Sequence, residues 1–316
     1  MSRVVILEPE GYNPEALALY GELGSVSATR LEGEARRAAL RDAEVIVIRL
    51  GDVRADLLAE APNLKVIASP TTGLNHIDLA EVERRGIRIV SLKGRRDITE
   101  KIYATSEHTI ALLLALLRHI PAAHAHVLNG GWDRQQFIGT EVSGKTIGIV
   151  GCGRLGSRVA TILQAMGATV IAADPHQPSD HIPAGVLVVS LLELLSRADI
   201  VSLHVDLSDE TTGMFDETAF AAMKPGAYVI NTSRGQIVQE AALLHALESG
   251  HLAGAAIDVL NDESGDAHHL RENPLRAYAQ THGNLIITPH LGGATRESMG
   301  LTEIAIAREV LAVLKP

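Results

Sequence analysis

Three glycines within residues 145–174 have the type and spacing that can bind a dinucleotide. Gly151, Gly153 and Gly156 follow a short apolar, strand-like run and open a helix-like run, in GxGxxG spacing. In such a loop the first glycine permits a tight turn, the second lets the backbone approach a pyrophosphate, and the third lets the helix pack on the strand. The diphosphate then lies at the helix N-terminus, where unpaired N–H groups and the helix dipole favour anions. The pattern therefore predicts a Rossmann-type nucleotide site.

Asp174 ends the second strand of this unit and indicates which cofactor binds. A carboxylate at this place accepts hydrogen bonds from the adenosine ribose hydroxyls, and it repels the 2′-phosphate of NADP. The next residues are Pro175 and His176, so neither arginine nor lysine follows directly to bind that phosphate. We therefore expect NAD as the cofactor, and no metal.

Three charged residues follow expected strands in the second half of the chain: Arg234 in NTSRGQIV, Glu263 in AIDVLNDE and His290 in ITPHLGG. Because the carboxyl ends of parallel strands converge on one crevice, these side chains can meet beside a bound nicotinamide. Each also has an ordinary interpretation when taken alone. Arg234 can be a loop cation, Glu263 a solvated acid and His290 a helix-capping residue.

The elements that would position these residues alternate between strand-like and helix-like runs, which is typical of βαβ units and parallel sheets. Strands are expected at 4–7, 45–48, 65–68, 87–90, 146–150, 169–173, 200–204, 227–231, 253–257 and 285–288. Amphipathic helices are expected at 14–23, 54–61, 191–198, 239–249 and 295–314. The polar segment 91–109 is expected to lead into one long helix that reaches about Leu128. The broad apolar face of that long helix is wide enough to pack on its own domain and on a second subunit. The polar stretch 261–272 is expected to be loosely ordered.

Composition limits the class of protein. The chain has 316 residues, 46% hydrophobic and 21% charged, which fits two globular domains. A formal net charge of −10 argues against nucleic acid as a partner. The single cysteine, Cys152, excludes internal disulfides and fits a reducing cytoplasm, and its thiol is better interpreted as a small apolar filler than as a redox sensor. The N-terminus lacks the apolar core of a signal peptide, and the longest apolar run, 110–117, is too short to cross a membrane.

Two segments of the first domain have open interpretations. Residues 69–78, SPTTGLNHID, form a glycine-bearing turn directly after a strand, where open α/β sheets bind ligands, although a plain connecting loop is favoured when this segment is taken alone. Residues 91–109 are polar and basic. Four cations lie within a few residues of Tyr103 in the sequence: Lys93, Arg95, Arg96 and Lys101. They either bind a second anionic group of a substrate or form a solvated loop, and the solvated loop is favoured.

Taken together, these motifs resemble the D-isomer-specific 2-hydroxyacid dehydrogenase family, which includes phosphoglycerate dehydrogenases. The resemblance covers nearly the whole chain in the family's order: SPTTGLNHID, the helix 104–118, GGW, GKTIGIVGCGRLG, NTSRGQIV, GAAIDV and NLIITPHLGG. It implies an α/β protein in which a Rossmann dinucleotide-binding domain is inserted into a smaller, flavodoxin-like substrate domain. The implied domains are 1–104 with 294–316 for the substrate and 105–293 for NAD.

The resemblance also implies roles for individual residues. Arg234, Glu263 and His290 take the catalytic positions, and Thr72, Gly73 and Leu74 join Arg234 in binding the substrate carboxylate. Besides the three glycines of the loop, the implied cofactor positions are Arg154, Leu155, Asp174, His204, Thr232, Ser233, Asp258, Gly292 and Gly293.

Residue chemistry agrees with these roles. Reduction of a 2-keto acid needs a hydride, which the nicotinamide supplies, and a proton, which a histidine can donate near neutral pH. Glu263 would orient His290 and favour its imidazolium form, and Arg234 offers a planar cation to the carboxylate and the keto oxygen.

This chain departs from the family's pattern at three places: Ser264 and Asp206 stand where proline is usual, and the segment after Val90 is longer and more basic. Two other functions remain open. One is a non-catalytic NAD-binding regulator of the corepressor type, and the other is a dehydrogenase of formate or phosphite. The sequence leaves the particular hydroxy acid open; we expect a small-molecule substrate and a cytoplasmic homodimer.

Overall fold

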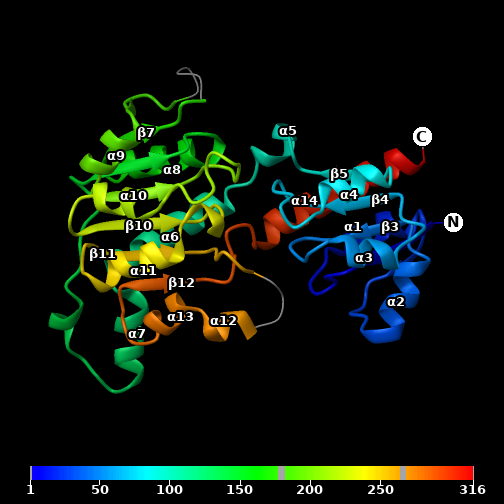
Figure 1. Ribbon diagram of the computed structural model, residues 1–316, viewed down its shortest axis with the longest axis horizontal. Helices are drawn as coiled ribbons and strands as arrows, with labels where there is room; N and C mark the ends of the chain where they lie inside the picture. Colours follow the sequence, from blue (N-terminus) through cyan, green and yellow to red (C-terminus); the bar gives the residue numbers. More distant parts are fainter. Residues whose placement is uncertain (1, 177–181, 264–267, 316) are drawn as a thin grey trace. The chain divides into compact units, whose positions relative to one another are not determined.

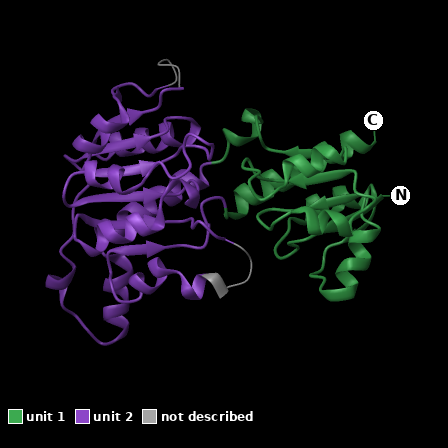
Figure 2. Cartoon of the chain, in the orientation of Figure 1, with its two compact units in different colours: residues 1–102, 294–316 green, residues 103–293 purple. Residues whose placement is uncertain are grey.

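The computed structural model describes residues 2–176, 182–263 and 268–315, which form two compact units (Figures 1 and 2). The first unit comprises Met1–Ile102 and Ala294–Pro316, and the second comprises Tyr103–Gly293. The chain thus leaves the first unit, builds the second, and returns for its last helix.

A five-stranded parallel sheet in the order β2-β1-β3-β4-β5 forms the centre of the first unit. This 2-1-3-4-5 order is that of flavodoxin-like folds. The strands are β1 Ser2–Ile6, β2 Gly24–Ser27, β3 Val45–Val47, β4 Val66–Ser69 and β5 Arg88–Ser91. The helices are α1 Pro14–Gly21, α2 Gly33–Arg41, α3 Ala55–Glu60, α4 Leu79–Arg84, α5 Arg96–Thr99 and α14 Arg296–Leu314.

Alternating strand residues place a separate apolar cluster on each face of this sheet. Val4 and Ile6 pack with α1 and α14, whereas Val5 packs with α2 and α3. A buried acid also ties α14 to the rest of the unit. Glu303, 1% exposed, accepts from Arg49 Nε at 3.0 Å and from the backbone N–H of Asn13 at 2.7 Å. The last helix is therefore part of this unit's core.

The second unit contains a seven-stranded parallel sheet in the order β12-β11-β10-β9-β6-β7-β8. Counted from β6, this is the doubly wound Rossmann order with one more strand at an edge. The strands are β6 Thr146–Val150, β7 Thr169–Ala173, β8 Leu187–Val188, β9 Ile200–Leu203, β10 Ala227–Asn231, β11 Leu252–Ile257 and β12 Leu285–Ile287. The fold class expected from the sequence is confirmed.

Helices flank this second sheet, and short helical turns lie in its connections. They are α6 Ala104–Leu117, α7 Ile120–Leu128, η1 Arg134–Phe137, α8 Arg154–Ala165, α9 Leu191–Arg197, α10 Glu217–Ala222, η3 Gly235–Ile237, α11 Glu240–Glu248, α12 His268–Glu272 and α13 Pro274–Ala279. Part of the stretch expected to be loosely ordered, 261–272, is therefore helical. Residues 264–267, including Ser264, lie outside the described residues.

The expected single long helix, leading on from the segment 91–109 to about Leu128, is wrong: the structure has two helices, α6 and α7, bent by 61°. His119 adopts a left-handed conformation with φ of 52° between them. Pro121 follows and has no N–H to donate to the carbonyl of Leu117, which instead accepts from Thr140 N at 2.9 Å. In the described part of the chain, no single helix is long and apolar enough to cross a membrane, and this bent pair alone reaches that combined length and composition.

Candidate functional site

The glycine loop joins β6 to α8, and each of its glycines meets a different constraint. Gly151 has φ of 87°, and a Cβ there would lie 2.7 Å from Val205 N. A Cβ on Gly156 would lie 2.0 Å from the carbonyl oxygen of Gly151, which shows how closely α8 packs on the end of β6. A Cβ on Gly153 would meet no described atom within 4 Å. Gly153 therefore borders open space, where a pyrophosphate can approach the backbone.

The start of α8 can bind an anion. Gly153 is its N-cap residue, and no side chain among the described residues caps the helix there. The first residues of the helix, Arg154 and Leu155, therefore present backbone N–H groups at the positive end of the helix dipole. The residues at this place fit a diphosphate.

Asp174 lies directly after β7, next to the glycine loop. Its carboxylate accepts from Cys152 N at 2.8 Å and from His176 N at 3.0 Å. The acid is thus fixed by the loop backbone itself, at the strand end where a ribose is expected.

Cys152 is fully buried beneath this loop, with its sulfur 3.7 Å from Ser157 Oγ. Burial raises the pKa of the Cys152 thiol, and the nearby Asp174 acts in the same direction. A buried thiol with a raised pKa is a poor nucleophile, which supports the packing role over a redox role.

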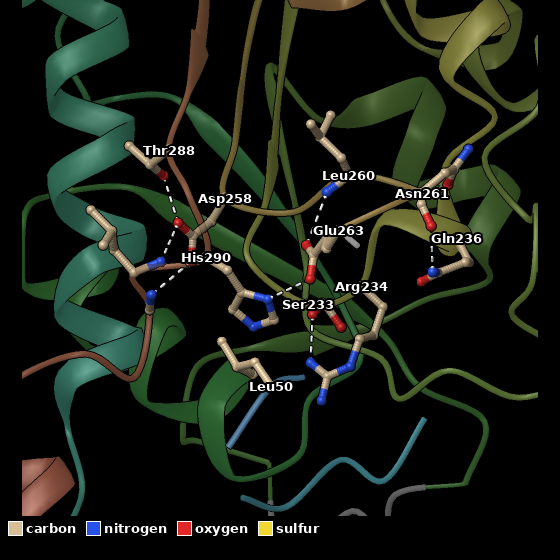
Figure 3. Close-up of polar contacts among 12 residues, drawn as sticks. Leu50, Ser233, Arg234, Gln236, Asp258, Leu260, Asn261, Glu263, Thr288 and His290 are labelled. Atoms are coloured by element: carbon tan, nitrogen blue, oxygen red, sulfur yellow. Dashed lines mark hydrogen bonds and ion pairs between the residues drawn. The ribbon is translucent and has the colours of Figure 1, made fainter. Parts of the chain in front are cut away.

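The three residues expected to be catalytic all lie in the second unit, and two of them are in contact (Figure 3). His290 Nδ1 lies 2.7 Å from Glu263 Oε2, and Glu263 Oε1 accepts from Leu260 N at 3.1 Å. Arg234 follows β10 and donates from Nη1 to the carbonyl oxygen of Ser233 at 2.6 Å. Burial holds the pKa of Arg234 below its usual value, and the negative charges of Glu263 and Asp206 offset part of that shift.

The turn that carries His290 is held by Asp258, at the end of β11. The side chain of Asp258 accepts from Thr288 Oγ1 at 2.6 Å, Leu291 N at 2.8 Å and Gly292 N at 2.7 Å (Figure 3). Its carbonyl oxygen accepts from His290 N at 2.9 Å, and His290 has the left-handed φ of 53°. Asp258 and Gly292 therefore share one hydrogen-bonded turn, with Gly293 next to it.

Hydroxyl groups after β10 are used in packing this edge of the sheet. Thr109 on α6 donates to the Thr105 carbonyl at 2.7 Å, so Thr232 donates its own hydroxyl to Thr109 Oγ1 at 2.8 Å. Ser233 donates its hydroxyl to the carbonyl of Val205. Both residues are thereby fixed at the carboxyl end of β10, beside Arg234.

His204 follows β9, next to the glycine loop. Its Nε2 lies 2.9 Å from Ser202 Oγ, and desolvation in this partly buried place lowers the pKa of His204 to about 4. The imidazole is therefore neutral at physiological pH.

The expected substrate loop belongs to the first unit, at the carboxyl end of β4. Thr71 Oγ1 donates to the Gly73 carbonyl at 2.9 Å and lies 2.7 Å from Ser69 Oγ, which shapes the turn. Among the described residues, the backbone N–H groups of Thr72, Gly73 and Leu74 have no acceptor. Three such N–H groups in one turn can bind a carboxylate.

Two residues of the basic segment contact partners within their own units. Arg95 pairs with Asp97 at 2.9 Å and with Glu309 on α14. Tyr103, in the second unit, lies under the guanidinium of Arg158 on α8, 4.0 Å from the ring centroid. Arg95 is thus engaged structurally, and Lys93, Arg96 and Lys101 are exposed.

Two residues of α6 that were not predicted, His108 and Thr109, contact Thr232 after β10, Asp258 after β11 and Thr288 before His290. The available signal was the polar run SEHT at the start of an otherwise apolar helix. Among the described residues there is no cluster of histidine, cysteine and carboxylate side chains that could hold a metal ion.

Comparisons with known proteins agree with this geometry. The family model for the D-isomer specific 2-hydroxyacid dehydrogenase, NAD binding domain, matches residues 110–292. The D-3-phosphoglycerate dehydrogenase of Mycobacterium bovis is 37% identical over 98% of this chain, which spans only 57% of that relative's length. The D-lactate dehydrogenase of Aquifex aeolicus, complexed with NAD and lactic acid, has a TM-score of 0.83 at 28% identity, covering 99% of this chain and 96% of that one.

A formate dehydrogenase from Staphylococcus aureus in complex with NAD has the same TM-score of 0.83 at 28% identity, covering 100% of this chain and 96% of that one. The fold is therefore shared by proteins named for different substrates. The match of the family model to more than half of the chain, over the residues that form the glycine loop and the His290 turn, identifies the family. The chain belongs to the D-isomer specific 2-hydroxyacid dehydrogenases, and its second unit contains their NAD-binding domain.

Proposed function

We propose that the chain is an NAD-dependent oxidoreductase that interconverts a D-2-hydroxy acid and the corresponding 2-keto acid. The observation that carries this proposal is the 2.7 Å contact between His290 Nδ1 and Glu263 Oε2, with Arg234 nearby, in the unit that bears the NAD loop. The names of its relatives, D-3-phosphoglycerate dehydrogenase and D-lactate dehydrogenase, support it.

His290 is the proposed acid and base. Glu263 occupies Nδ1, which leaves Nε2 as the ring nitrogen that exchanges a proton with the substrate oxygen. In the reducing direction His290 would give its proton to the keto oxygen, and NADH, when bound, would supply the hydride that the keto carbon needs. The carboxylate of Glu263 stabilises the imidazolium before that transfer. In the oxidising direction, neutral His290 removes the hydroxyl proton.

Arg234, in the second unit, is a proposed ligand of the substrate carboxylate, and the loop after β4 is the proposed carboxylate-binding loop of the first unit. The planar guanidinium offers two parallel N–H donors to a carboxylate, and the N–H groups of Thr72, Gly73 and Leu74 offer more. The domain roles follow: we assign 1–104 with 294–316 to the substrate and 105–293 to NAD.

The proposed NAD ligands form three groups in the second unit. The glycine loop and the start of α8 bind the diphosphate, and Asp174 binds the adenosine ribose. Residues after β9, β10, β11 and β12 complete the site toward the nicotinamide; these are His204, Thr232, Ser233, Asp258, Gly292 and Gly293.

An NADH-oxidation screen tests the proposal. The purified chain should consume NADH with at least one member of a panel of 2-keto acids that includes phosphorylated and dicarboxylic ones. NADH binding without reduction of any of these keto acids would favour a non-catalytic regulator, which would not need the contact of Glu263 with His290. NAD reduction by formate or phosphite alone would favour the third function.

We also propose that two copies of the chain associate through α7 and the segment after it. This region exposes large apolar side chains: Ile120 53%, Val127 47%, Leu128 74%, Trp132 90% and Ile138 72%. A patch of this kind marks an interface, and a twofold axis would pair it with itself. Light scattering of the wild type should give a mass of twice the 33.6 kDa chain, and Leu128→Glu should give the mass of a single chain. A wild-type monomer would contradict the proposal.

A cytoplasmic location, and the absence of membrane and nucleic-acid partners, remain predictions from composition. Cell fractionation checks the first, and retention on heparin at low salt would contradict the last.

A further inference from the structure

Asp258 is a buried carboxylate with more hydrogen-bond donors around it than the His290 turn supplies. It is 1% exposed, and its two carboxylate oxygens accept hydrogen bonds from Thr288 Oγ1, Leu291 N and Gly292 N of that turn. A fourth donor comes from a different element: His108 Nε2 on α6 lies 3.1 Å from Asp258 Oδ1. Among the described residues, His108 is the one group paired with Asp258 that can carry positive charge.

The contacts fix the tautomer of His108. Its Nε2 also lies 3.2 Å from Thr288 Oγ1, whose hydrogen is donated to Asp258 at 2.6 Å. Both neighbours of Nε2 therefore act as acceptors, so Nε2 must carry the hydrogen. His108 thus holds Asp258 and Thr288 together. Thr288 is the first residue of the turn 288–292 that carries His290, and Asp258 accepts the hydrogen bonds of that turn.

The turn needs this support because its backbone is strained. His290 has φ of 53°, a conformation that a non-glycine residue keeps only where neighbouring contacts enforce it. His290 N donates to the carbonyl of Asp258 at 2.9 Å, so a shift of Asp258 moves His290 directly. Without His108, Asp258 Oδ1 would keep Thr288 Oγ1 and Leu291 N as donors but would lose the hydrogen bond that ties it to α6.

We propose that His108 is a positioning residue for the reaction: by its hydrogen bond to Asp258 it holds the 288–292 turn in the geometry that presents His290 to Glu263. This inference rests on the proposed function for its catalytic consequence. It requires no contact between His108 and the substrate or the cofactor.

Three variants test the proposal. His108→Leu removes the donor, and His108→Gln keeps an N–H that reaches toward Asp258. His245→Leu is the matched control, because His245 is exposed on α11, away from the His290 turn. We expect His108→Leu to lower kcat by about tenfold to a hundredfold, as for a displaced catalytic group, with little change in the KM for the keto acid. His108→Gln should recover most of that loss, and His245→Leu should behave as wild type.

A second readout is independent of turnover. The Cε1–H proton resonance of His290, identified by its absence in His290→Ala, is compared among the variants by NMR at one pH. The charged groups around His290 in the described part of the second unit are Glu263, Arg234 beside it and Asp258 behind the turn, and all are retained. We expect the resonance to shift in His108→Leu and to return toward wild type in His108→Gln.

The outcomes separate the two proposals. Wild-type kcat and an unshifted His290 resonance in His108→Leu would overturn the positioning role, as would a His108→Gln variant as impaired as His108→Leu. If the wild-type chain reduces no keto acid, the proposed function fails, and the NMR comparison still decides the role of His108. If His108→Leu does not fold by circular dichroism, His108→Asn replaces it, because the shorter amide does not reach Asp258; the same expectations apply.

Discussion

Alanine at Gly156 and at Gly153 should separate the fold of the nucleotide loop from its binding function. At Gly156 the new Cβ would lie 2.0 Å from the Gly151 carbonyl oxygen and 3.0 Å from a methyl of Ile149, so α8 must move away from β6. At Gly153 the new Cβ would meet no described atom within 4 Å, and the residue already has φ of −70°. The same methyl group therefore disturbs packing at one position and only the ligand space at the other.

The two expected magnitudes differ accordingly. Overpacking a well-packed contact costs about 1–3 kcal/mol, so Gly156→Ala should lower the apo Tm by roughly 2–12 °C for a unit of this size. Gly153→Ala should leave the apo Tm nearly unchanged. Its methyl group lies where the pyrophosphate approaches the backbone, so NADH affinity should fall by about tenfold or more.

Thermal denaturation without ligand, paired with titration of NADH by fluorescence, measures both quantities on the same samples. Gly156→Ala should chiefly lower the apo Tm, and Gly153→Ala should chiefly lower the NADH affinity. An apo Tm for Gly153→Ala as low as that of Gly156→Ala, or normal NADH binding by Gly153→Ala, would refute this account of the loop.

Three further predictions concern charge. Because Asp174 is fixed at the end of β7 by Cys152 N, NADH should bind at least about tenfold more tightly than NADPH, and tighter NADPH binding in a direct titration would contradict that role. Glu263→Gln keeps an acceptor for His290 Nδ1 but removes the charge that stabilises the imidazolium, so kcat at neutral pH should fall by about tenfold, and an unchanged kcat would remove Glu263 from the reaction. Burial lowers the pKa of His204 to about 4, so the contribution of the neutral imidazole to folding stability is complete above the ordinary pKa of about 6.5 and is lost as the pH falls through about 4. His204→Gln should therefore flatten the apo Tm profile between these two pH values, and an unchanged slope would show that other groups dominate.

Local patterns in the sequence were sufficient to predict the nucleotide loop. A strand, three spaced glycines, an amphipathic helix and an acid at the next strand end lie within thirty residues or so, and their geometry follows from backbone sterics. The meeting of Glu263 and His290 was predictable for another reason, since residues at the carboxyl ends of neighbouring parallel strands lie at one edge of the sheet.

Contacts between distant segments were not predictable in the same way. The break after Leu117 depends on a tertiary change of donor: Pro121 has no N–H, so Thr140 N donates to the Leu117 carbonyl instead. Hydrophobic periodicity continues across such a break and so predicts one helix. The contact of His108 with Asp258 joins α6 to the end of β11, 150 residues apart in the chain. No spacing rule connects them, so a histidine at the start of an apolar helix was not distinguishable from a solvated one.

The most direct test of His290 as the acid and base is the kcat of His290→Ala with the best keto acid of the screen, compared with the NADH affinity of the same variant. We expect kcat to fall on the order of a hundredfold or more because the proton donor is gone, while NADH affinity stays close to wild type because the glycine loop and Asp174 are untouched. A His290→Ala variant that reduces the keto acid at a near-normal rate would contradict the account.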